Sequence, residues 1–169
     1  MSPLLKADLH SHTHFSADAL TSPQQYVEAC LQRGINCVAV TEHNNIGGAL
    51  AVQKIAPFRV IIGEEVRTTD GEIMGLFLHE EIPGGLTPEE TVRRIKEQGG
   101  LVAIPHPIDR FRKEPLRREA LLRILPQVDI IEAFNARTTL GRDNRRAAAF
   151  AAEHGLPAAA GSDAHSPWE

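Results

Sequence analysis

Short apolar runs alternate along the chain with longer segments whose apolar residues recur at helical spacing. Runs typical of buried strands cover residues 4–10, 36–44, 59–66, 72–78, 101–107, 129–135 and 156–165, and helical segments cover 22–34, 46–55, 87–99, 114–126 and 142–155. Strands that alternate with helices are typical of a parallel sheet covered by helices, either open or closed into a barrel. The pattern therefore predicts an α/β fold.

Capping and turn signals place the ends of several elements. Ser22 with Gln25, and Thr87 with Glu90, have the spacing of a capping box, so each pair predicts the start of a helix. Turn-forming residues at 68–71 join two apolar runs and predict a hairpin. Because no linker, low-complexity tract or change of composition divides the chain, we expect 1–169 to form a single domain.

Composition excludes several classes of protein. The 169 residues carry a net charge of −4, so no basic surface suggests nucleic acid or anionic lipid as an obligatory partner. The apolar runs are too short to cross a bilayer, and the first residues lack the pattern of a signal peptide. Cys30 and Cys37 are too few for a disulfide scaffold. We therefore expect a cytoplasmic protein with no membrane association.

Polar side chains with ligand capacity gather where the predicted strands end. Such residues close the runs that end near residues 10, 43, 65, 106, 135 and 163. In α/β folds the carboxyl ends of parallel strands form the edge where ligands bind. The His10–His12 and Asp163–His165 pairs are two residues apart, so each pair points to one face of an extended chain. The sequence therefore predicts one polar cluster at this edge.

The residue types in this cluster suit divalent metal ions. Imidazole and carboxylate are ligands for Zn²⁺, Mn²⁺ or Fe²⁺, and no thiolate lies near them in sequence. A carboxylate between histidines can bridge two ions, which would generate hydroxide at neutral pH and hold a phosphate. A single His-x-His pair or His-Pro step is a weak signal and is often only a loop. Five such signals at the same end of one sheet favour a metal site.

Five motifs together resemble those of the PHP (polymerase and histidinol phosphatase) domain family. They are DLHSHTHFSADA at 8–19, TEHN at 41–44, GEEV at 63–66, PHP at 105–107 and GSDAH at 161–165. The resemblance implies a distorted (βα)7 barrel with two or three divalent ions in its mouth. It also implies that the protein hydrolyses a phosphoester.

The resemblance assigns metal ligands residue by residue. Glu65 matches the bridging glutamate, which leaves Glu64 as a neighbour outside the ligand set. Glu65, Asp163 and His165 would then carry the catalytic role. The ligands implied are His10, His12, Asp18, His43, Glu65, His106, Asp163 and His165.

The chain departs from the family pattern at several positions. Glu72 stands where many members have a histidine ligand, and we consider it either a ninth ligand or an ordinary hairpin residue. His79 lies further along, and we favour a surface position for it. Glu42 replaces the usual aspartate and is expected to alter a contact behind the ligands. The chain ends at Glu169, where members usually continue, so we expect the barrel to lack a final helix and a homo-oligomer to cover that flank.

A phosphate substrate needs positive charge in addition to the metal ions. Arg110 and Arg137 follow predicted strands, and arginine suits bidentate contact with phosphate. For Arg137 a solvated surface position is the alternative. His14 is a candidate for an outer contact or for a proton donor to the leaving group.

Three functions are consistent with these residues. The first is metal-dependent hydrolysis of a small phosphorylated metabolite or nucleotide. The second is a nuclease that acts on nucleic-acid ends, which residues 110–118 favour and the net charge of −4 disfavours. The third is a catalytically silent domain that binds metal or serves in assembly.

Overall fold

The computed structural model describes residues 4–109 and 115–169. Its strands are β1 (Ala7–Asp8), β2 (Cys37–His43), β3 (Arg59–Thr68), β4 (Gly71–Leu76), β5 (Leu101–Ile104), β6 (Ile130–Asn135) and β7 (Ala158–Gly161). Its helices are α1 (Pro23–Gln32), α2 (Gly47–Gln53), α3 (Pro88–Glu97), α4 (Arg118–Ile124), continued by a 3₁₀ turn at Leu125–Gln127, and α5 (Gly141–Glu153). Strands and helices alternate as the sequence predicts, and β3 connects directly to β4 through the predicted hairpin.

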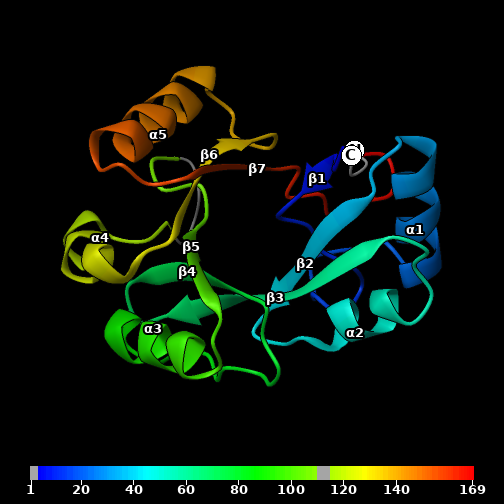
Figure 1. Cartoon of the computed structure of the whole chain (residues 1–169), viewed down its shortest axis with the longest axis horizontal. Coiled ribbons are helices and arrows are strands. Elements are labelled where there is room, and N and C mark those ends of the chain that lie inside the picture. Colours follow the sequence, from blue (N-terminus) through cyan, green and yellow to red (C-terminus); the bar gives the residue numbers. More distant parts are fainter. Residues whose placement is uncertain (1–3, 110–114) are drawn as a thin grey trace.

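The strands form one sheet in chain order that curls into a nearly closed barrel (Figure 1). Past the end of β1, the Leu9 amide donates to Ala160 O, and the Asp163 amide donates to His10 O at 2.7 Å. Ser11 and Ala164 form a parallel bridge that extends the same seam. The barrel implied by the family resemblance is therefore confirmed.

Strand β4 makes the sheet mixed. It runs antiparallel to both β3 and β5, whereas the other neighbouring strands are parallel. The hairpin predicted at 68–71 is present, and Thr68 pairs with Gly71 across it. The general expectation of a parallel sheet fails at β4 because a short turn can only join antiparallel strands.

Both predicted helix starts are present. One has the complete capping box, and the other has only the first of its two hydrogen bonds. Ser22 accepts from the Gln25 amide, and the Gln25 side chain accepts from the Ser22 amide, which completes a capping box. Thr87 accepts from the Glu90 amide. The Glu90 side chain does not return to the cap, because it binds the guanidinium groups of Arg93 and Arg94.

The alternation of side chains along the strands separates an apolar interior from an outer layer under the helices. Val38 and Val40 of β2 pack outward with residues of α1 and α2. Near the starts of β2 and β3, the side chains that point into the barrel are apolar. Near the ends of the same strands, the inward side chains are those of His43 and Glu65. The apolar inner cluster consists of Cys37, Ala39, Ile61, Met74, Leu76 and Ala103. The polar edge therefore lies next to an apolar layer of the barrel interior.

The helices of the described residues include none that is both long and apolar enough to span a bilayer.

Glu64 is a carboxyl group buried in the outer layer, and its ionisation affects the stability of the fold. Its side chain is fully buried, accepts from the Ile82 amide at 2.9 Å, and has one oxygen without a hydrogen-bond partner among the described residues. Burial raises the pKa of Glu64 from 4.5 to about 7, with a contribution from the neighbouring Glu81. Ionisation of Glu64 therefore opposes folding as the pH rises through this range.

We expect Glu64→Gln to keep the bond to Ile82 and remove this pH dependence. Because the folded-state pKa is raised, stability is full below the ordinary pKa and is lost as the pH rises toward neutrality. Relative to the variant, the wild-type free energy of unfolding should fall by on the order of 3 kcal/mol between acidic pH and about pH 8. Urea unfolding at several pH values measures this, with exposed Glu28→Gln as control. Parallel pH profiles for wild type and Glu64→Gln would contradict the assignment.

Candidate metal centre

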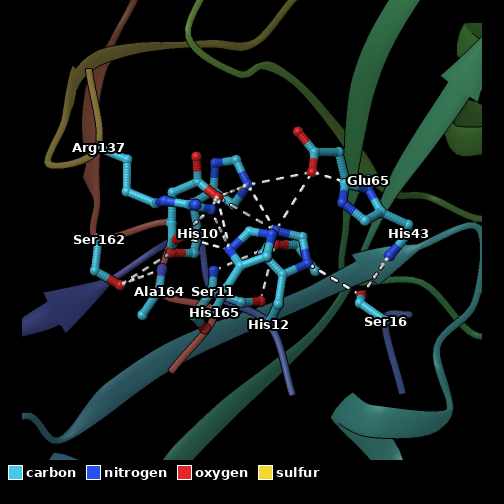
Figure 2. A network of polar contacts seen from close by, with 12 residues as sticks. His10, Ser11, His12, Ser16, His43, Glu65, Arg137, Ser162, Ala164 and His165 are labelled. Carbon is cyan, nitrogen blue, oxygen red and sulfur yellow. Dashed lines mark hydrogen bonds and ion pairs between the residues drawn. The ribbon is translucent and has the colours of Figure 1, made fainter. Parts of the chain in front are cut away.

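The two histidines after β1 lie side by side at the barrel mouth (Figure 2). Both His10 and His12 are fully buried, and their Nε2 atoms are 3.2 Å apart. This is the geometry expected for side chains two residues apart on an extended segment. Two basic nitrogens this close favour a shared cation between them over two protonated rings.

Glu65 lies at the centre of the cluster. Its Oε2 atom is 3.4 Å from Nε2 of His10 and of His12 and 3.3 Å from Nδ1 of His43. Its Oε1 atom is 3.1 Å from Nε2 of His106. One carboxylate thus faces four imidazoles with its two oxygens, which is the arrangement a bridging ligand needs.

Asp163 closes the cluster from the end of β7. Its Oδ1 atom is 3.6 Å from Nε2 of His10 and 3.5 Å from Nε2 of His12. The residue has a φ of 55°, in the left-handed region that favours glycine. Such a conformation is unfavourable by about 1–3 kcal/mol, and residues that adopt it are often found at functional sites.

The open side of the cluster is formed by Asp18, His43 and His165. Asp18 Oδ2 is 3.5 Å from Nε2 of His43 and 3.7 Å from Nε2 of His165. The Asp18 side chain is 54% exposed, whereas the rings it faces are mostly buried. This side of the cluster is therefore its more solvent-exposed side.

Glu72 of β4 lies in the same cluster. Its Oε1 atom is 3.6 Å from Nδ1 of His43, and its Oε2 atom is 3.7 Å from Nε2 of His106. Its Oε1 atom is also 3.4 Å from Nε of Arg67. Of the two interpretations of Glu72, the geometry favours a ligand over an ordinary hairpin residue.

Two segments of the chain match known protein families. Residues 8–115 match the PHP domain, and residues 141–169 match the region described as PHP-associated. The uncharacterized protein MJ1587 of Methanocaldococcus jannaschii is 41% identical over 146 aligned residues, and the match covers 78% of this chain and 82% of that protein. The chain belongs to the PHP domain family.

Solved structures share the PHP fold at low sequence identity. A two-domain protein of Bacteroides vulgatus that contains a predicted PHP-like metal-dependent phosphoesterase has a TM-score of 0.76 and 21% identity over 97% of this chain. The lesion-specific endonuclease PfuEndoQ of Pyrococcus furiosus has a TM-score of 0.67 and 19% identity over 96% of this chain. The chain covers 53% and 49% of these two proteins, so it spans about half of their length.

The residues of this PHP centre fit divalent metal ions. Imidazole and carboxylate atoms fall into groups of three whose ligand atoms all lie within 4.8 Å of one another. Nδ1 of His43 is buried without a hydrogen-bond partner among the described residues and points toward the carboxylates of Glu65 and Glu72. A cation bound at that position would satisfy this ring nitrogen. The groups are His12–His43–His165, His10–His12–Asp163, His10–Glu65–His106 and His43–Glu65–Glu72.

The pKa values of the histidines differ according to their partners. Burial lowers the pKa of His43 to about 4 and that of His165 to about 3, so both rings are neutral at pH 7 and can act as ligands. Burial also lowers the pKa of His10, but Glu132 and Glu65 outweigh it and raise the value to about 10. A metal ion at Nε2 of His10 would displace the proton from that atom.

Glu132 of β6 holds the ligands from behind and was not found from the sequence. Its Oε1 atom is 2.9 Å from Nδ1 of His10, and its Oε2 atom accepts from the His106 amide at 2.6 Å. Asn135 bridges Glu132 to Asp163 through its side-chain amide. The only signal in the sequence is a buried-strand pattern interrupted by a carboxylate.

Glu42 supports the other side of the centre, in agreement with the expected contact behind the ligands. Its carboxylate accepts from Thr13 and from the Ser16 hydroxyl. Ser16 in turn contacts Nδ1 of His12 at 3.2 Å and accepts from the His43 amide at 3.0 Å. The longer side chain of glutamate thus reaches the loop that follows β1.

Of the other residues considered from the sequence, Arg137 lies beside the ligand cluster, and His79 and His14 are exposed. Arg137 lies at the rim, with Nη1 2.6 Å from Nδ1 of His165 and 3.9 Å from Oδ1 of Asp163. Arg110 falls in 110–114, outside the described residues. His79 is exposed and belongs to none of the ligand groups, as expected for a surface residue. The exposed ring of His14 stacks on Phe15.

We expect Glu132→Gln to weaken metal binding without unfolding the protein. The amide keeps the shape but loses the negative charge that orients His10 and raises its basicity, and loss of such a partner typically weakens metal affinity by about 10–100-fold. Chelator competition with Mn²⁺ and Zn²⁺ measures this effect, and exposed Glu153→Gln on α5 serves as control. Equal affinities for Glu132→Gln and wild type would contradict this role.

Proposed function

We propose that the protein is a metal-dependent phosphoesterase that hydrolyses a phosphate ester of a small metabolite or nucleotide. The observation that supports this most directly is the position of Glu65, whose two oxygens face four imidazoles. The ions would be held by His10, His12, Asp18, His43, Glu65, Glu72, His106, Asp163 and His165. Divalent ions in such a centre lower the pKa of water and neutralise the charge of a phosphate.

The residues of the chain then orient the reactants. Glu65, Asp163 and His165 face the space between the clustered ligands, where the ions that bind the phosphate would be held. Arg137 stands beside Asp163 and His165 at the rim and is suited to hold the phosphate oxygens. Ser162 does not serve as a nucleophile in this proposal, because its hydroxyl contacts His10 O and accepts from the Ala164 amide.

Cleavage of nucleic acid is the second candidate. The observation that favours it is the fold shared with the lesion-specific endonuclease of Pyrococcus furiosus. The net charge of −4 disfavours it, because phosphodiester chains are bound mainly through basic surfaces. A panel of phosphomonoesters, nucleotides and short oligonucleotides separates the two functions, and a steep salt dependence of binding would favour nucleic acid.

We expect Asp163→Asn and Glu65→Gln to reduce turnover by at least about 10³-fold, since both remove charge from the centre. The test uses protein loaded with Mn²⁺, Fe²⁺ or Zn²⁺, and the readouts are initial rate, metal content and thermal unfolding. The exposed-residue variant Glu153→Gln is the control. Metal-loaded wild type that hydrolyses none of the panel would refute the proposal and leave a silent metal-binding or assembly domain.

Arg137→Met should raise KM for the phosphate substrate by about 10–100-fold, which corresponds to the loss of one charged hydrogen bond of ~1.5–3 kcal/mol. In protein loaded with excess metal, the metal content should stay the same, because the guanidinium is not a ligand. Arg145→Met on the exposed side of α5 is the matched control. A KM equal to that of wild type would place Arg137 outside the substrate site.

A further inference from the structure

The four ligand groups of the centre differ in their donor atoms. Three of them contain two or three imidazoles each. The group His43–Glu65–Glu72 contains one imidazole and two carboxylates, so it is the richest in oxygen. Carboxylate ligands suit Mn²⁺ and other hard divalent cations, whereas imidazole ligands suit Zn²⁺. The ion positions are therefore chemically unequal within one chain.

The β3–β4 hairpin creates this oxygen-rich group. Glu65 and Arg67 are two residues apart on β3, so they face the same side, and Arg67 pairs directly with Glu72 of β4. Nδ1 of His43 is 3.3 Å from Oε2 of Glu65 and 3.6 Å from Oε1 of Glu72. The unpartnered ring nitrogen thus points into the space between two carboxylates.

Arg67 contacts a carboxylate oxygen of Glu72 that belongs to this group. Its Nε atom is 3.4 Å from Oε1 of Glu72, the same oxygen that faces His43. The Glu72 side chain is 8% exposed and that of Arg67 is 44% exposed, so the guanidinium approaches from the solvent side. A positive charge at this distance repels a cation and competes for the carboxylate. Any ion bound here is therefore held more weakly than its ligands alone would allow.

We propose that His43, Glu65 and Glu72 form an exchangeable position for a hard divalent cation such as Mn²⁺, in which Glu72 disfavours Zn²⁺ and Arg67 limits affinity. This inference rests on the metal-dependent function proposed above and adds selectivity among its ions. Zn²⁺ binds most nitrogen and oxygen sites more tightly than Mn²⁺. The selectivity is therefore a smaller preference for Zn²⁺ at this position than at the imidazole-rich positions.

Competition between Mn²⁺ and Zn²⁺ tests the role of Glu72. Metal-free protein is dialysed against equal concentrations of both ions, and bound metals are measured by plasma mass spectrometry, with Mn²⁺ environments followed by electron paramagnetic resonance. Glu72→His gives this group two imidazoles, and its ratio of bound Mn²⁺ to Zn²⁺ should fall at least 10-fold. Glu80→His adds a histidine at an exposed position and should leave the ratio unchanged.

Glu72→Gln is the second variant and guards against misfolding of the histidine variant. It should lose the most weakly bound Mn²⁺ equivalent and retain the others. An unchanged Mn²⁺ to Zn²⁺ ratio in Glu72→His, or full retention of Mn²⁺ in Glu72→Gln, would overturn the inference. Because the readout is bound metal, these results stand apart from turnover: an inactive protein with the predicted ratios would refute only the proposed function.

Arg67→Met tests the opposing charge. Removal of the guanidinium should strengthen Mn²⁺ binding at this position by about 10-fold, since one repulsive charge near the ion is lost. Arg59→Met, at the exposed start of the same strand, is the matched control. Equal or weaker Mn²⁺ binding in Arg67→Met would contradict the part assigned to Arg67.

Discussion

The arrangement of the barrel mouth depends on the contact between the Glu65 carboxylate and the imidazoles around it. Glu65 is almost fully buried, and its pKa is held well below the usual value: burial opposes this, but the facing histidines, His10 foremost, outweigh it. A buried charge of this kind is stable only when cations or donors surround it. The residues that reach it come from several strand ends, so one carboxylate fixes how those ends converge.

Polar side chains converge at the barrel mouth because the inward-facing residues change along a strand from apolar to polar. On β2 and β3 the inward residues near the start are small or apolar, as at Ala39 and Ile61, and those near the end are polar, as at His43 and Glu65. A period of two residues therefore places the centre next to an apolar layer of the interior. Strand β4 enters in the opposite direction, so Glu72 reaches the mouth from the start of its strand rather than from the end.

Local sequence signals predicted much of this arrangement. The spacing of His10 and His12 and the turn at 68–71 depend only on neighbouring residues, and both are found as expected. Glu132 could not be found in this way, because it is 122 residues from His10 in sequence and its role exists only after the barrel has formed. The same holds for Arg67, whose importance depends on pairing with Glu72 across the hairpin. Family resemblance supplied the ligand set, whereas the residues behind the ligands required the fold.

The seam that closes the barrel is also the seam that positions the metal ligands. His10 O accepts from the Asp163 amide, while the side chains of both residues face His12. Gly161 lies so close to β1 that a Cβ there would be 2.4 Å from Cβ of His10. Any residue other than glycine would therefore push the first ligand away from the last. Ions bound across this seam would stabilise the closed barrel by mass action, since the unfolded chain holds no such arrangement. For the ligands that follow β1 and β7, closure of the barrel and assembly of the centre are thus one event.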